Sequence, residues 1–310
     1  MSSRAFSDRN TGYVFIASIF WGTSFPAISL GLRYASPEQL LFLRFFIASL
    51  IAIALYRGSL MKALTVRSLA LVGWINGVAY LLQFIGQQWV PAGQTSILVN
   101  SFTIITPFFA YFIIGENLTI RKIIAAVIGL IGVFFITNNA TSLVGVTSVE
   151  YLAGVVIVFI SGMIWGIYVT LGKKLQMNNR SSAKNSVSEK KITHSDIFVA
   201  TLVHTAILSA IGILLLGKPV DKLFLIEPLL AGTYLAIFCT IIPFSLYLRS
   251  LDHIDVGLSV IILLIEVIVS FLISNAYLGE IIGINQVFGS LLIISGIIIA
   301  ITGVNPEMEN

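Results

Sequence analysis

Apolar runs of about twenty residues fill this chain, and their length constrains the fold more than any other feature. A helix needs about 20 residues to cross the roughly 30 Å of bilayer hydrocarbon. Short breaks that carry Gly, Pro, Asn and most of the charge separate the runs. No run alternates with the period of two that a membrane barrel requires, so we predict an all-α integral membrane protein. The ten predicted transmembrane helices span 13–32, 38–56, 69–89, 95–114, 120–137, 151–172, 197–216, 228–248, 257–278 and 283–303.

The composition excludes a water-soluble domain. Hydrophobic residues make up 57% of the chain, charged residues 10%, and the mean hydropathy is +0.98. A soluble domain carries about 25% charged residues.

The apolar runs form two matching halves, which indicates an internal duplication. Four landmarks of the first half recur in the second, and the two sets are Trp21-Gly22, Gly93, Gly115-Glu116 and Gly132, then Trp165-Gly166, Gly257, Gly279-Glu280 and Gly296. We predict a first repeat over 12–140 (helices 1–5) and a second over 150–303 (helices 6–10). Because each repeat has an odd number of helices, the second is inverted in the membrane. Secondary transporters are commonly built in this way, with the substrate between the halves.

The positive charges are sorted by side, so the net charge of +4 does not indicate a nucleic-acid partner. With the N-terminus in the cytoplasm, most of the 18 Lys and Arg fall in inside loops, which is the positive-inside bias. We therefore expect both termini to be cytoplasmic. The segment 173–194 is expected to be a basic, flexible cytoplasmic loop between helices 6 and 7. The first apolar run continues to residue 32 without a cleavage site, so we interpret it as a retained helix.

Motifs for catalysis, ATP binding or metal binding were not found. The chain has no HExxH, no aspartate-rich pair, no GxSG turn and no GxxxxGK[ST] loop, and its single cysteine, Cys239, excludes a disulfide framework. We expect neither enzyme activity, nor a cofactor, nor a metal site.

Polar residues follow one face of several predicted helices. Asn76, Tyr80, Gln83 and Gln87 share a face of helix 3, and Asn100 and Thr103 share a face of helix 4. Tyr247 belongs to a more aromatic stripe on helix 8. Lipid cannot hydrogen-bond an amide, so these faces contact either a substrate cavity or neighbouring helices.

Aromatic and ionisable residues within the spans have two interpretations each. Trp21, Trp165 and Tyr168 either line a central cavity or anchor the helices at the membrane interface. Glu266 is either a proton-coupling group or a neutral structural carboxyl. Arg44 either extends outward to the headgroups or binds an anionic group, and His204 is either functional or a packing residue.

The chain resembles the drug/metabolite transporter superfamily, and within it the ten-helix EamA type with two EamA repeats. The resemblance rests on FWGTSFPAISLGLR, PEQLLFLRFFIA, GQTSILVNSFTIITPFFAYFIIGENLT and VGLSVIILLIEVIVSFLISNAYLGEIIGINQVFGSLLIISGIII, and it covers about residues 12–303. It implies a central cavity inside helices 1–4 and 6–9, location in the plasma (inner) membrane, and export or exchange of small metabolites such as amino acids. Two departures are Val267 after Glu266, where the family often has proline, and Pro107 about one turn late.

Taken together, the residues and the resemblance predict a secondary active transporter that works by alternating access around a midplane cavity. Its partners would be a small-molecule substrate, the lipid bilayer and protons, and the protein would be a monomer or a homodimer. A non-coupled channel or sensor is the alternative, followed by an intramembrane enzyme. The predicted substrate-binding residues are Trp21, Tyr80, Gln83, Asn100, Thr103, Trp165, Tyr168 and Tyr247, and the predicted coupling residues are Glu266, His204 and Arg44.

Overall fold

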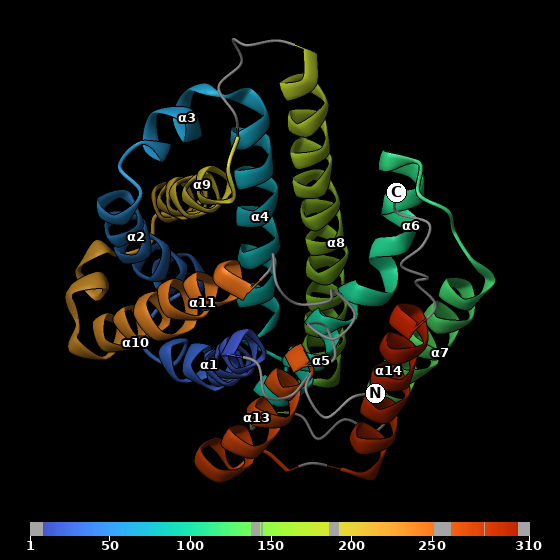
Figure 1. Cartoon of the computed structure of the whole chain (residues 1–310). Helices are drawn as coiled ribbons and strands as arrows, with labels where there is room; N and C mark the ends of the chain where they lie inside the picture. The colour runs from blue at the N-terminus through green and yellow to red at the C-terminus, as the bar shows by residue number, and fades with distance from the viewer. Residues whose placement is uncertain are drawn as a thin grey trace.

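A computed structural model describes residues 9–137, 143, 145–185, 192–250, 262–281 and 283–302, and this part of the chain is a bundle of helices (Figure 1). The elements are α1 (Arg9–Gly31), α2 (Pro37–Leu55), α3 (Ser59–Thr65), α4 (Arg67–Gly86), α5 (Ala92–Asn100), α6 (Phe102–Ile114), α7 (Ile120–Thr137), α8 (Ser148–Asn185), α9 (His194–Leu215), η1 (Val220–Phe224), α10 (Ile226–Ala236), η2 (Ile237–Ile241), α11 (Ile242–Ser250), α13 (Ile265–Ile273), η3 (Ser274–Leu278) and α14 (Ile284–Thr302).

The membrane class predicted from the sequence is confirmed. Seven helical spans of the described chain are long and apolar enough to cross a bilayer, and two shorter apolar stretches, Ile265–Leu278 and Ile284–Ile299, follow them. Every predicted span contains a helix in the structure, although residues 257–261 of the ninth lie outside the described residues. The total of ten transmembrane helices stays a prediction.

Two of the spans are interrupted. The span predicted at 95–114 divides into α5 and α6 at Ser101, whose N–H is shared between the carbonyls of Ile97 and Leu98 at 3.2 and 3.3 Å. Pro107 lies inside α6, beyond this interruption. The span predicted at 228–248 contains a π-helical turn, η2, between α10 and α11.

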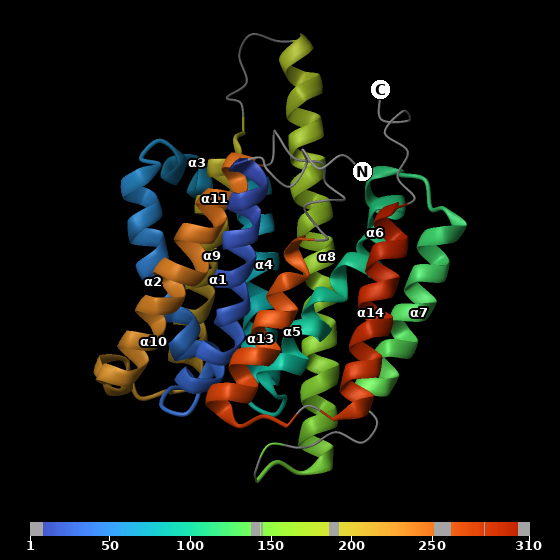
Figure 2. The same ribbon diagram turned by 60° about the horizontal axis from the view of Figure 1, so that its bottom comes forward.

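The helix α8 is longer than predicted. We expected a flexible loop from residue 173, but the helix continues to Asn185 and extends beyond its neighbours (Figure 2). No Gly or Pro interrupts the chain between 173 and 185, so nothing local ends the helix there. The ammonium of Lys173 also forms an ion pair of 2.7 Å with Glu116.

Helices α7 and α14 pack side by side at one edge of the bundle (Figures 1 and 2). Their glycines allow close approach, because a Cβ on Gly132 would lie 2.6 Å from the carbonyl oxygen of Gly289. Gly296, further along α14, meets Ala125, earlier in α7, so the pair is antiparallel. These glycines therefore let α7 and α14 pack closely.

The first helices of the two predicted repeats, α1 and α8, run in opposite directions through the bundle (Figure 2). An inverted duplication requires this arrangement. The largest buried cluster lies among α2, α4, α9 and α10, and α1 packs against α11 and α13. The helices that carry the predicted site residues therefore come together from both halves of the chain.

Candidate functional site

The side chain of Arg44 is buried between α2 and the second half of the chain, with 2% of its surface exposed. Its Nε donates a hydrogen bond of 3.0 Å to Thr240 Oγ1, and Nη2 donates one of 3.2 Å to the carbonyl oxygen of Cys239. That carbonyl is available because Pro243, four residues later, has no N–H to donate to it. The Thr240 hydroxyl donates to the carbonyl of Leu235 at 2.9 Å and can therefore accept from Arg44. Arg44 points into the protein and does not extend to the membrane surface.

Aromatic rings surround the Arg44 guanidinium. Its Cζ lies 5.0 Å from the centroid of the Tyr80 ring and 5.3 Å from that of Phe45, which is the geometry of cation–π contacts. The Tyr80 ring also meets Trp165 edge-on, with centroids 4.8 Å apart. Trp165 in turn lies 5.5 Å from Tyr168. Residues of α2, α4 and α8 thus form one aromatic cluster around a buried cation.

The indole N–H of Trp165 is a second notable group of this cluster. Its Nε1 is buried and has no hydrogen-bond partner among the described residues. The neighbouring Tyr168, in contrast, has its hydroxyl 3.2 Å from Thr201 Oγ1. An unpartnered buried donor costs free energy unless something other than this part of the protein satisfies it.

The carboxylate of Glu266 faces the first half of the chain. Asn100 Nδ2 donates to Glu266 Oε1 at 3.4 Å and to the carbonyl of Ser96 at 2.9 Å. Helix α1 packs tightly here, because a Cβ on Gly22 would lie 2.6 Å from the carbonyl oxygen of Glu266. Arg44 and Glu266 are near enough for an electrostatic interaction, but the described residues form no direct ion pair between them.

The two predicted tryptophans do not stack on one another in the described residues. Trp21 packs edge-on against Tyr247, with ring centroids 5.6 Å apart, and Trp165 packs against Tyr80. Each tryptophan therefore contacts a tyrosine of the opposite half. Gln83 is buried on α4, and Thr103 is half-buried near the start of α6. Their binding roles stay predictions.

Two residues of the predicted polar stripe, Asn76 on α4 and Gln87 directly after it, connect helices. Asn76 Nδ2 donates to Thr205 Oγ1 on α9 at 3.1 Å. Gln87 Nε2 donates to the carbonyl of Phe25 on α1 at 2.6 Å. For these two positions the structure supports the helix-bonding interpretation.

His204 lies apart from the cluster, at the contact between α4 and α9. Its Nδ1 is 2.9 Å from the carbonyl oxygen of Ala200, one turn earlier in the same helix, and its ring lies 6.0 Å from that of Trp74. A Cβ on Gly73 would lie 2.9 Å from the imidazole. These contacts favour the packing interpretation of His204.

Glu280 was assigned no role from the sequence, but the structure gives it one. Gly279 takes a left-handed conformation with φ of 68°, which turns the chain after η3. The Glu280 carboxylate then accepts the backbone N–H groups of Ala92 at 2.7 Å and Gly93 at 3.2 Å, at the start of α5. Burial raises the pKa of Glu280 above its ordinary value, and it outweighs the two N–H donors, which lower the pKa. The sequence did contain a signal for this contact, because the spacing between Gly93 and Gly115-Glu116 recurs between Gly257 and Gly279-Glu280.

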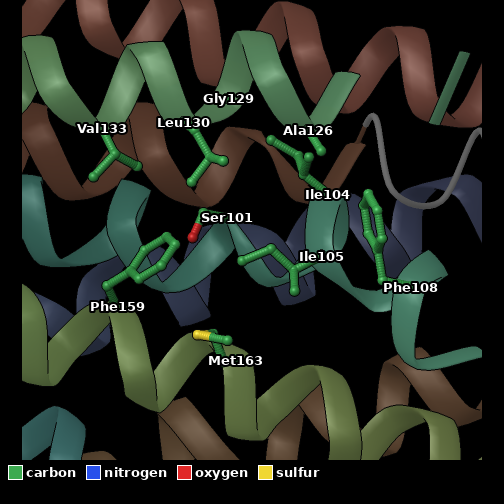
Figure 3. Close-up of a pocket in the computed structure, with 10 residues that line it drawn as sticks. All are labelled: Ser101, Ile104, Ile105, Phe108, Ala126, Gly129, Leu130, Val133, Phe159 and Met163. Carbon is green, nitrogen blue, oxygen red and sulfur yellow. The ribbon is translucent and has the colours of Figure 1, made fainter. Parts of the chain in front are cut away.

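A pocket of about 230 Å³ lies between α6, α7 and α8, and none of Arg44, Tyr80 and Trp165 lines it (Figure 3). It is lined by Ser101, Ile104, Ile105, Phe108, Ala126, Gly129, Leu130, Val133, Phe159 and Met163. The hydroxyl of Ser101 already donates to the carbonyl of Leu98 at 2.6 Å. This apolar pocket offers no free polar group to orient a metabolite. We therefore place the candidate site at Arg44 and the aromatic residues around it, and call this group the Arg44 cluster: Arg44, Phe45, Tyr80, Trp165 and Tyr168, with Thr240.

Comparison with known proteins identifies the family. The model of the EamA-like transporter family matches residues 11–138 and 152–302. The chain belongs to this family. It is therefore a multi-pass membrane transporter, as the resemblance predicted.

Relatives of this chain carry the name of uncharacterized transporters. An uncharacterized transporter of Clostridium kluyveri is 25% identical over 306 residues, covering 93% of this chain and 92% of its own. The uncharacterized transporter YoaV of Bacillus subtilis is 23% identical over 294 residues, covering 90% and 92%. A solved crystal structure shares the fold with a TM-score of 0.61 at 20% identity, covering 94% of this chain and 96% of its own.

Proposed function

We propose that this EamA-like transporter is a secondary active transporter that exports or exchanges small metabolites such as amino acids. It works by alternating access, as a monomer or a homodimer of the plasma (inner) membrane with both termini cytoplasmic. The substrate binds at the Arg44 cluster.

One observation supports this proposal above the others: the polar and aromatic cluster is drawn from both halves of the chain. Arg44 and Tyr80 come from the first half, and Trp165 and Thr240 from the second. A substrate held by such a cluster contacts both halves at once. Movement of one half against the other then changes the side from which the substrate is reached.

Glu266 is the proposed coupling group. It contacts Asn100 across the two halves, and a carboxyl within the bilayer is costly when charged. A proton taken up from one side and released to the other removes and restores that cost as the halves move. This would couple substrate movement to a proton gradient.

A non-coupled channel or a sensor is the alternative. The described residues hold few ionisable side chains within the spans, so a selectivity filter built from a ring of charged side chains has little support. An intramembrane enzyme lacks support, because the sequence contains no motif for one.

Counterflow in liposomes tests the proposal. Purified protein is reconstituted with unlabelled amino acids inside, and uptake of the same labelled amino acid is followed with and without a pH gradient. A carrier gives saturable uptake that requires substrate on the opposite side, whereas a channel gives uptake that does not saturate. Liposomes without protein provide the control, and loss of counterflow in Trp165→Ala would locate the site.

A further inference from the structure

We propose that Arg44 binds a carboxylate group of the transported substrate, and that the aromatic cluster beside it holds an apolar or aromatic body. This proposal rests on the proposed function and specifies the chemical class of the substrate. It also selects one of the two interpretations that the sequence left open for Arg44.

The first argument is the missing counter-ion. Arg44 is 2% exposed, yet the ion pairs of the described residues, Lys62–Asp196 and Lys173–Glu116, do not involve it. A buried charge without an opposite charge is strongly destabilising, and ionisable groups within a membrane are retained where they serve function. Glu266 interacts with Arg44 only at longer range. An anionic ligand would provide the missing charge.

The second argument is the geometry of the guanidinium. Thr240 and the Cys239 carbonyl hold Nε and Nη2, so the plane of the side chain is fixed before a ligand arrives. Within the described residues, Nη1 donates to no protein acceptor. Arginine presents a rigid fork of donors that matches a carboxylate, and a fixed fork loses little entropy on binding.

The third argument concerns the surroundings of the fork. The Tyr80 ring lies beside the Arg44 guanidinium, and the Trp165 ring packs against Tyr80. The buried Trp165 Nε1 has no hydrogen-bond partner among the described residues. Aromatic faces hold apolar or aromatic groups, and a free indole N–H can donate to a second polar atom of the ligand. A carboxylate on an apolar or aromatic body fits both features.

Binding of matched probes tests the proposal without requiring transport. The probes are phenylacetate, phenylethanol and phenethylamine, which share a phenyl body and differ in the head group. The change in Tm of the purified protein in detergent is measured against probe concentration. We expect phenylacetate to bind wild-type protein more tightly than either other probe. We expect Arg44→Met to weaken phenylacetate binding at least about tenfold, since hydrogen bonds to a charged group contribute that much, and to leave phenylethanol binding unchanged.

Two further variants keep the test decisive. Arg57→Gln, an exposed position, makes the same change of charge and should retain the preference for phenylacetate. If Arg44→Met does not fold, Arg44→Lys keeps the charge but loses the fork, and phenylacetate should bind it at least threefold more weakly. A wild-type protein without preference for phenylacetate, or a preference that survives the loss of Arg44, overturns the proposal. Failure of amino-acid counterflow with intact phenylacetate binding would instead contradict the proposed function alone.

Discussion

The carboxylate of Glu280 caps the start of α5, where the N–H of Ala92 donates to it across 2.7 Å although 188 residues separate the two in the chain. The contact joins the turn that follows η3, in the second half of the chain, to a helix of the first half. Gly93 donates to the same carboxylate. Two backbone donors that α5 cannot satisfy internally are thereby satisfied by a side chain from the other half.

Replacing Glu280 with alanine should therefore lower stability. The variant leaves the N–H groups of Ala92 and Gly93 without this acceptor, at an expected cost of about 1–3 kcal/mol. Thermal unfolding in detergent at neutral pH measures the effect. Glu227→Ala, at an exposed position in the first turn of α10, is the matched control and should unfold close to wild type. Equal Tm values for the two variants would contradict the capping role.

Glu280 should also give stability a defined pH dependence. Because burial raises its pKa above the ordinary value of 4.5, the folded protein keeps a proton at pH values where the unfolded chain has lost it. Folding then binds a proton, so the stability of wild type relative to Glu280→Gln should fall as pH rises above 4.5 and become constant once the folded-state carboxyl is ionised. Thermal unfolding of both proteins across this range measures the difference. A relative stability that increases with pH would show that the sign is wrong.

Gly132 should not tolerate a large side chain. In Gly132→Leu the new Cβ would meet the carbonyl oxygen of Gly289 at 2.6 Å, so α7 and α14 would have to separate. We expect destabilisation of about 1–3 kcal/mol, as for overpacked cores. The yield of monodisperse protein and its Tm provide the measurement. Gly172→Leu on α8, where no atom lies within 4 Å of the new Cβ, should have little effect.

Glu266→Gln should separate substrate binding from proton coupling. The amide keeps the size and the hydrogen-bonding ability toward Asn100 but cannot titrate. Counterflow should continue, and its dependence on pH should disappear. His204→Gln should keep the pH dependence of wild type, because His204 contacts its own helix and Trp74, away from the cluster. Unchanged pH dependence in Glu266→Gln would remove Glu266 from the proton pathway.

The sequence predicted the features that depend on regular patterns. The apolar runs located the helices, because a membrane-spanning helix needs an apolar run of nearly fixed length. The predicted end of the helix α8 was wrong. The polar, basic composition after residue 173 is typical of a linker, although no residue there ends the helix.

The contacts of the site were less accessible from the sequence. Arg44 was recognised as unusual, but its partner Thr240 lies 196 residues away and is presented by a π-helical turn. Such a pairing depends on how α2 packs against α10 and η2, and no local pattern encodes this packing. The Glu280 contact, in contrast, could have been inferred from the sequence. A glycine precedes a Gly-Glu pair by the same number of residues in both halves, which relates Gly93 to Gly279-Glu280 by the duplication.

The pairing of Arg44 with Thr240 also constrains the order of events during synthesis. Ribosomes add about 5–20 residues per second, so the 196 residues between them take about 10–40 s to make. During that interval α2 is in the membrane with an arginine whose partner does not yet exist. Arginine costs up to about 3 kcal/mol at the centre of an inserting helix, and less toward either surface. The first half of the chain therefore remains in the bilayer without this contact until the second half is made. A chain truncated before α10 never forms the contact and should be a substrate for membrane quality control.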